Sequence, residues 1–197
     1  MNRRNALRKT AILAGTAAVA PSLLSLLQSC KEQSRLNWQP VFLSEDQARF
    51  ISAFVDTILP KTETPGALDV KTDIFIDLVY AKVYDKKAQE NVVAEIEKFN
   101  ATCKERFGDV FADLSPEDKA AMLKAADAES GKFNGNVWGT AVGKQEPVGF
   151  YRSLKSMTLS GYFSSEEIGK NYLSYDPIPG EYLGCIPLSD VGNSWSL

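Results

Sequence analysis

Cys30 is the residue with the clearest chemical role in this chain. It follows Leu27-Gln28-Ser29 at the end of an apolar stretch, and the four residues together resemble a bacterial lipobox. In a lipobox a small residue precedes a cysteine that is diacylated on sulfur and becomes the mature N-terminus. One acyl chain binds a bilayer only marginally, at about 0.8 kcal/mol per buried CH2, so stable attachment needs more than one chain. We predict lipidation at Cys30; the alternatives are a general secretory signal with an incidental cysteine, or an uncleaved anchor helix.

The residues before this cysteine have the parts of an export signal. Arg3 and Arg4 lie in a basic N-terminal region, and the 17 residues from Ala11 to Leu27 are apolar, which is the lower limit for a bilayer span. The basic region resembles a twin-arginine signal, the type that directs the export of already folded proteins. We predict a twin-arginine lipoprotein signal peptide over residues 1–29 and a lipid-anchored tether over residues 30–43.

The usual catalytic residue types are missing from the chain. It has no histidine, which removes the commonest general base and the commonest metal ligand. It has no CxxC pair for zinc, haem or an iron–sulfur cluster, and no glycine pattern typical of a phosphate-binding loop. We therefore expect no catalytic residue, no bound cofactor and no metal in this chain.

Carboxylates are the remaining candidates for chemistry. Glu63, Asp69, Asp73 and Asp77 lie close together in the sequence. The three aspartates recur every four residues, as on the solvated face of a helix, and they lack the dense loop spacing of a calcium-binding EF-hand. We predict a solvated helix face here.

Cys103 and Cys185 are the cysteines that remain once Cys30 is acylated. In an oxidising compartment they could form a disulfide that ties the C-terminal tail to a mid-chain helix. Two separately buried thiols are the alternative, and the sequence leaves both open.

Length and charge narrow the class of protein. Without residues 1–29 the chain has 168 residues, with 18 Lys and Arg against 25 Asp and Glu. This length suits one domain, which we place at residues 44–197. Because the net charge is negative, nucleic acid is a poor partner.

Helical patterns dominate this domain. Ser44 and Gln47 have the spacing of a capping box, and the apolar residues that follow predict a helix over 45–59 that ends before Pro60. Helical spacing returns from Val70 to Val79 and from Lys86 to Phe107, where Gly108 has the position of a C-cap.

Three more helical segments follow. Ser115 and Pro116 predict the start of a helix whose inward face includes Met122, Leu123 and Ala126. After a glycine-rich break over 131–143 that contains Trp138, we predict a helix over 147–160 and a short turn from Ser165. No segment alternates over strand length. The fold class is therefore mostly α, an irregular bundle of about five or six helices.

The tail from Tyr172 to the C-terminus has a different composition. Prolines and glycines interrupt large apolar residues, so residues 172–197 cannot form one helix and yet carry groups that water disfavours. The tail therefore packs on its own bundle or on a partner subunit, and both options stay open.

Several segments, in order along the chain, carry a resemblance to a known family. They are 42–47 (FLSEDQ), 56–67 (DTILPKTETPGA), 150–155, 158–166 (TLSGYFSSE), 175–180 (YDPIPG) and the tail as far as Trp195. Together with the signal, they are similar to the gluconate 2-dehydrogenase subunit 3 family, the small subunit of membrane-associated flavoprotein sugar dehydrogenases.

The resemblance implies a function without catalysis in this chain. Such a small subunit binds a large FAD-dependent dehydrogenase of the glucose-methanol-choline type, which often lacks its own signal, and carries it folded across the membrane. The large subunit oxidises a sugar or sugar acid and passes electrons to a cytochrome c or another acceptor. We therefore expect FAD in the partner, none here, and a location on the periplasmic side of a membrane.

Buried aromatic residues dominate stable interfaces, and proline-rich segments lose little entropy on ordering. Our candidates for a partner interface are accordingly Tyr162, Phe163, Tyr175, Pro177, Pro179, Tyr182 and Trp195. The alternative for each is a place in the core. Two other functions stay open: a stand-alone lipid-anchored periplasmic binding or interaction protein, and an enzyme that uses a carboxylate or tyrosine site.

Overall fold

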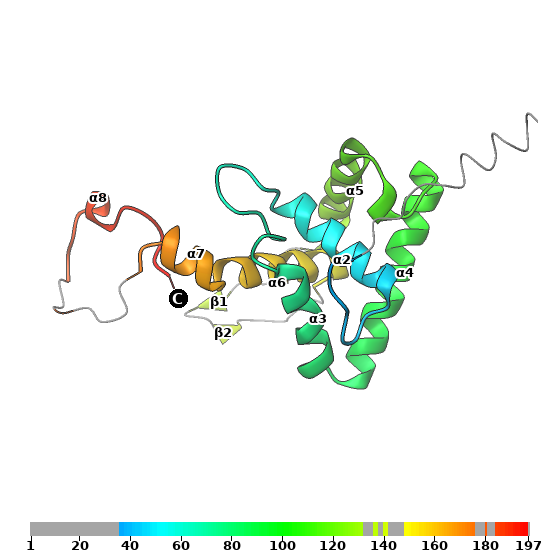
Figure 1. Cartoon of the computed structure of the whole chain (residues 1–197), viewed down its shortest axis with the longest axis horizontal. Coiled ribbons are helices and arrows are strands. Elements are labelled where there is room, and N and C mark those ends of the chain that lie inside the picture. Colours follow the sequence, from blue (N-terminus) through cyan, green and yellow to red (C-terminus); the bar gives the residue numbers. More distant parts are fainter. Residues whose placement is uncertain are drawn as a thin grey trace, which may run out of the picture. The chain divides into compact units, whose positions relative to one another are not determined.

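The structure is a computed structural model that describes residues 36–131, 136–137, 140–141, 148–175, 180 and 184–196. The described residues are mostly helical, as predicted (Figure 1). Seven residues that the sequence singles out lie outside this part of the chain: Arg3, Arg4, Cys30, Trp138, Pro177, Pro179 and Tyr182.

Helix α2 (Glu45–Ile58) begins with the predicted capping box. The Ser44 hydroxyl accepts from the Gln47 amide, and the Ser44 amide donates to the Gln47 side chain at 3.0 Å. The side chain of each residue thereby accepts a hydrogen bond from the backbone amide of the other.

The next helices begin and end near their predicted residues. Helix α3 is Thr72–Lys82, and α4 is Lys86–Phe107, after which Gly108 takes a left-handed conformation with φ of 88°. A 3-10 turn η1 (Phe111–Asp113) leads into α5 (Pro116–Glu129), which Ser115 caps by accepting from the Asp118 amide. Local capping chemistry therefore sets most of these boundaries.

The C-terminal elements differ more from the prediction. Helix α6 is Phe150–Phe163, so it starts and ends three residues later than expected. Helix α7 is Glu166–Asn171, and the described part of the tail includes the short helix α8 (Leu188–Val191). Strands β1 (Asn136–Val137) and β2 (Thr140–Ala141) pair antiparallel, with Asn136 opposite Ala141. At two residues each they are too short to show a period of two.

Helix α2 is the centre of the packing. It contacts α3, α4, α5, α6 and η1 (Figure 1). The ring centroid of Phe50 on α2 lies 5.4 Å from that of Phe99 and 5.5 Å from that of Phe111. The ring of Phe54 meets that of Tyr151 on α6 edge-on, with the centroids 5.9 Å apart. Offset and edge contacts of this kind stabilise an aromatic core beyond its buried area.

The charged residue Arg49 is also buried in this packing. Arg49 of α2 forms an ion pair with Asp113 of η1, and its side chain is only 8% exposed. A buried guanidinium requires such a partner, so the pair holds η1 in place on α2.

Candidate docking surface

Tyr162 is a core residue, which removes it from the predicted partner interface. Its side chain is buried, and its hydroxyl donates to the carbonyl of Pro65 at 2.8 Å. The phenol fills the interior and its polar end finds an acceptor there, as a buried tyrosine requires. The bond joins the end of α6 to the loop between α2 and α3.

That loop, residues 60–71, is built on close backbone packing. The Ala67 amide donates to the Leu59 carbonyl at 2.9 Å, and the Gly66 amide donates to Asp69 at 2.8 Å. The Gly66 amide and the Lys61 ammonium together hold the pKa of Asp69 below its usual value. Through the bond from Tyr162 to Pro65, two of the segments that carry the family resemblance, 56–67 and 158–166, meet in space.

Phe163 is the neighbour of Tyr162 but lies on the surface. Its ring is 46% exposed and meets the Tyr162 ring edge-on at 5.3 Å. The buried ring beneath it fixes its position, so Phe163 remains a candidate for contact with another protein.

The described part of the tail folds back on the end of α7. The Ser174 amide donates to the Ser194 carbonyl, and the Ser196 amide donates to the Ser174 carbonyl, both at 2.9 Å. The Asn193 side chain donates to the Tyr172 carbonyl at 2.6 Å. These bonds use mainly backbone groups, so they hold the tail without burying its large side chains.

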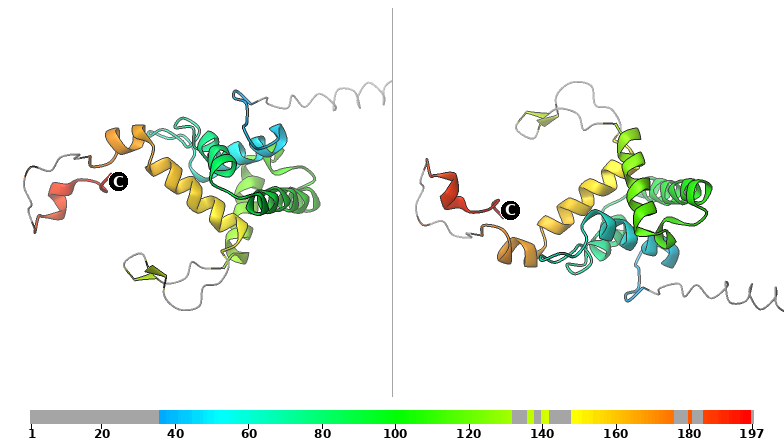
Figure 2. Two further views of the ribbon diagram at one scale, coloured as in Figure 1. Left: turned by 90° about the horizontal axis from the view of Figure 1, so that it is seen from below. Right: turned by 90° about the horizontal axis from the view of Figure 1, so that it is seen from above.

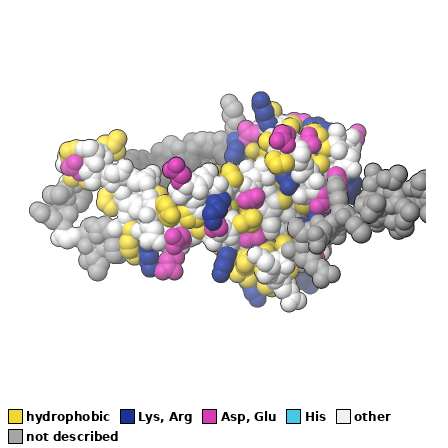
Figure 3. Space-filling view, turned by 45° about the horizontal axis from the view of Figure 1, so that its top comes forward, with side chains coloured by type: hydrophobic (Ala, Val, Ile, Leu, Met, Phe, Trp, Pro, Cys, Tyr) yellow, Lys and Arg dark blue, Asp and Glu magenta, His cyan; other side chains and the backbone are white. Residues whose placement is uncertain are grey.

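Four large apolar side chains in the described part of the tail are exposed. Tyr175, Ile186, Leu188 and Trp195 have exposed fractions between 43% and 86%. Hydrophobic side chains lie on the surface of the tail at the left of the molecule in Figure 3. We call these four residues and Phe163 the docking surface.

Two members of this surface were missed by the sequence interpretation. Ile186 and Leu188 are aliphatic, whereas only aromatic residues and prolines were selected. Leu188 has the largest exposed fraction of the set, 86%. The signal was present: an aliphatic residue inside a proline- and glycine-rich segment has few ways to be buried within its own chain.

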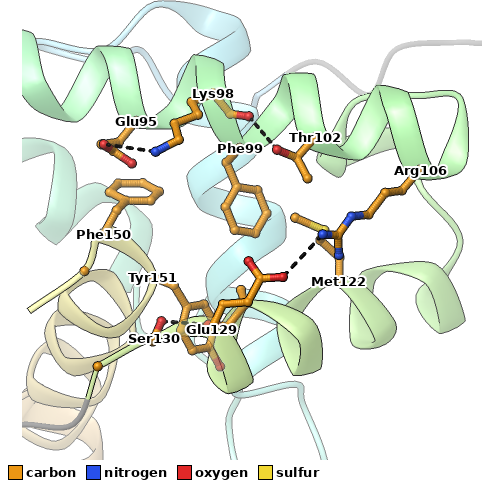
Figure 4. A pocket seen from close by; sticks show the side chains of 13 residues that line it. Glu95, Lys98, Phe99, Thr102, Arg106, Met122, Glu129, Ser130, Phe150 and Tyr151 are labelled. Carbon is orange, nitrogen blue, oxygen red and sulfur yellow. Dashed lines mark hydrogen bonds and ion pairs between the residues drawn. The ribbon is translucent and has the colours of Figure 1, made fainter.

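A groove of about 380 Å³ lies elsewhere, between α4, α5 and the start of α6 (Figure 4). The side chains of Phe99, Phe150 and Tyr151 line it. Across it, Arg106 of α4 pairs with Glu129 of α5 at 3.3 Å. The groove thus combines apolar rings with charges that are already paired.

Two hydroxyls in this groove are also occupied. Thr102 and Ser130 each donate to a backbone carbonyl four residues earlier, at 3.1 and 2.7 Å. In the described part of the chain no cluster of three or more acidic or cysteine side chains is placed to hold a metal ion. The groove therefore presents apolar surface and paired charges.

The prediction of a solvated aspartate face is wrong for two of its three members. Asp73 and Asp77 are buried, while Asp69 is exposed. Both buried carboxylates accept hydrogen bonds from the segment before α2. The four-residue spacing of the aspartates therefore reflects a contact with the segment before α2, not exposure to solvent.

The two cysteines are not paired. Cys103 is buried on α4 and Cys185 is exposed in the tail, and both thiols are free. Burial raises the pKa of the Cys103 thiol to about 11. Of the two options that the sequence left open, the bridge is absent, because one sulfur is enclosed by the core and the other lies in the exposed tail; of the other option, two buried thiols, only burial of Cys103 is confirmed.

Comparison with protein families gives one match. Residues 45–180, more than half of the chain, match the model of gluconate 2-dehydrogenase subunit 3. The chain belongs to this family. The family's name describes a subunit of a dehydrogenase, and the family inferred from the sequence is confirmed.

The family match includes Phe163 and Tyr175 but ends before the other three residues of the docking surface. No curated protein matches the chain, and no solved structure does. None of the helices in the described part combines the length and apolarity that a membrane crossing requires.

Proposed function

We propose that this chain is the non-catalytic accessory subunit of a flavin-dependent dehydrogenase that oxidises a sugar or sugar acid. It exports, anchors and stabilises a large partner of the glucose-methanol-choline type. FAD belongs to that partner, and a cytochrome c is a candidate electron acceptor. Membership of the subunit 3 family is the observation that carries the proposal.

The docking surface supports the proposal. Backbone hydrogen bonds of Ser174 with Ser194 and Ser196 hold the end of the tail, while the side chains of its four tail residues remain open to contact. Fully burying an aliphatic or aromatic side chain is worth about 1.5–3 kcal/mol, so the set offers a large part of the free energy of a stable interface. The chain would gain this free energy on binding the large subunit.

The N-terminal segment supplies the other two tasks. Arg3 and Arg4 would direct export of the folded complex, and Cys30 would carry the lipid on the periplasmic side of the membrane. A flavoprotein binds its cofactor in the cytoplasm, so a route that accepts folded proteins suits such a cargo.

The first experiment tests the partnership. The tagged full chain is expressed with a large flavin oxidoreductase of the glucose-methanol-choline type from the same genome, and membranes are assayed for bound flavin and for dye-linked sugar oxidation. We expect flavin and activity to co-purify with the tag, and neither chain alone to be both membrane-bound and active. Sugar oxidation by the purified small chain without a partner would overturn the proposal.

Substitutions then test the surface. Leu188→Ala combined with Trp195→Ala removes two exposed side chains, and because Trp195 is held through backbone groups the fold of the tail is kept. We expect about 100-fold weaker association, from roughly 10-fold or more for each side chain. Val83→Ala is the matched control: Val83 is 74% exposed at the end of α3 and should have no effect.

Export and anchoring have separate tests. Replacing both Arg3 and Arg4 with lysine should leave the flavoprotein in the cytoplasm. Cys30→Ser should move the complex from the membrane to the soluble periplasmic fraction with its activity kept. A complex that stays on the membrane after Cys30→Ser contradicts the lipid anchor.

A further inference from the structure

The segment before α2 is held by an aspartate on α3. We call residues 38–43 the strap. The backbone amides of Val41, Phe42 and Leu43 donate to the carboxylate of Asp77, at 2.6, 3.2 and 2.9 Å. Asp77 is fully buried, so three consecutive amides of an irregular segment converge on one enclosed charge.

A second aspartate holds the other end of the strap. The indole nitrogen of Trp38 donates to Asp73 at 3.1 Å, and the hydroxyl of Ser52 on α2 donates to the same oxygen at 2.7 Å. Asp73 lies one helical turn before Asp77 and is also buried. The strap, drawn in blue just before α2 in Figures 1 and 2, is therefore hydrogen-bonded to α3 at both ends.

These contacts depend on each other. A buried carboxylate is costly unless hydrogen bonds satisfy it, and charge-assisted bonds from backbone amides are among the strongest available. The strap forms no helix or strand, so its amides also need partners. Loss of the carboxylate charge would leave both sides unsatisfied.

We propose that Asp73 and Asp77 form a lock that positions the strap and thereby fixes where the N-terminal anchor leaves the domain. The role in anchoring rests on the proposed lipid at Cys30. Between Cys30 and Trp38 there are seven residues, which span at most about 25 Å when extended. With the strap released, 13 residues would separate Cys30 from Ser44 and the reach would rise to about 45 Å.

The lock therefore sets how far the domain stands from the membrane. With a short tether, the docking surface and the large subunit bound to it stay within a limited distance of the lipid surface. Asp73 and Asp77 are positioning residues in this scheme, since they act through the strap and touch neither lipid nor partner.

Hydrogen exchange tests the lock directly. We compare the full chain in detergent with its Asp77→Asn and Asp73→Asn variants, because asparagine keeps the shape and removes the charge. At Val41, Phe42 and Leu43 we expect exchange to be at least about 10-fold faster in Asp77→Asn, the loss expected for one charge-assisted bond. Asp56→Asn, an exposed aspartate on α2, is the matched control.

Unchanged exchange at these three amides in Asp77→Asn overturns the lock. A variant that unfolds would show faster exchange in α4 as well, so α4 serves as an internal reference. If Asp77→Asn unfolds, Trp38→Phe replaces it as the test, because it removes only the indole donor. The lock predicts faster exchange of the strap amides in Trp38→Phe with exchange in α4 unchanged. Unchanged exchange in the strap would contradict the lock.

The reach is tested on vesicles that carry the lipidated chain. Energy transfer from a dye at Cys185, the exposed thiol, to a lipid dye should weaken in Asp77→Asn and stay unchanged in Asp56→Asn. Equal transfer in Asp77→Asn and the parent chain refutes the positioning role. The Cys30→Ser test is independent: its failure removes the anchor while the exchange result still decides the lock.

Discussion

Replacing Gly66 with alanine tests whether backbone packing determines the loop between α2 and α3. A Cβ at Gly66 would lie 2.6 Å from the amide nitrogen of Lys61 and 3.0 Å from its Cα and from the carbonyl carbon of Pro60. All three are backbone atoms, so no side-chain rotation relieves the contact. The loop must move, and the bond from the Ala67 amide to the Leu59 carbonyl must stretch with it.

The expected cost follows from these contacts. Overpacking costs about 1–3 kcal/mol, and a weakened hydrogen bond adds about 1 kcal/mol. Alanine also restricts the unfolded chain, which offsets about 0.4–1 kcal/mol. We expect a net loss of about 1–3.5 kcal/mol in the free energy of unfolding. For a chain of this size that lowers the melting temperature by about 2–14 °C.

Two other glycines provide the comparison. At Gly180 an added Cβ would meet no atom within 4 Å, so Gly180→Ala should be neutral. At Gly161 it would lie 2.6 Å from the ring of Phe75, a half-exposed side chain that can shift, so an intermediate loss is expected. Denaturant unfolding followed by circular dichroism measures all three. If Gly66→Ala lies within about 0.5 kcal/mol of Gly180→Ala, the packing argument is refuted.

Further predictions concern Tyr162 and the cysteines. Tyr162→Phe should cost about 1 kcal/mol in denaturant unfolding because the bond to the Pro65 carbonyl is lost, whereas Tyr175→Phe, an exposed control, should be neutral. Equal effects of the two would contradict this. A maleimide should modify Cys185 in the folded chain and Cys103 only after unfolding. Since burial raises the pKa of Cys103 from 9.0 to about 11, its contribution to stability should be complete below pH 9 and be lost as the pH rises through 11. Stability that is constant over this range would refute that assignment.

Helix starts and ends could be predicted because their signals are local. Ser44, Ser115 and Gly108 act on backbone groups a few residues away, so residue type and spacing identify them. The first and last residues of α6 are predicted less accurately. Gly149 is its N-cap, and Gly161 lies inside it, where the missing side chain admits the ring of Phe75 from α3. The need for glycine at this position comes from the neighbouring helix α3, which the local sequence of α6 does not reveal.

The aspartates of α3 show what a local pattern omits. A period of four places Asp73 and Asp77 on one face but does not say whether water or protein covers that face. The strap begins 35 residues before Asp73, and its amides have no regular partner of their own. The backbone amides of an irregular segment need acceptors. Aligned carboxylates on a helix near such a segment therefore predict a contact between the two.

Composition places candidates for a docking surface in the tail but does not say which side chains are exposed. An apolar candidate must also lack a place in its own core, and only its apolar character is visible in composition. Tyr162 is apolar but has a place in its own core, because its hydroxyl reaches a carbonyl 97 residues earlier in the chain. Leu188 meets both conditions, since the backbone bonds that hold the tail leave its side chain exposed. The contrast explains why selection by aromatic character included a core residue and passed over the most exposed member of the surface.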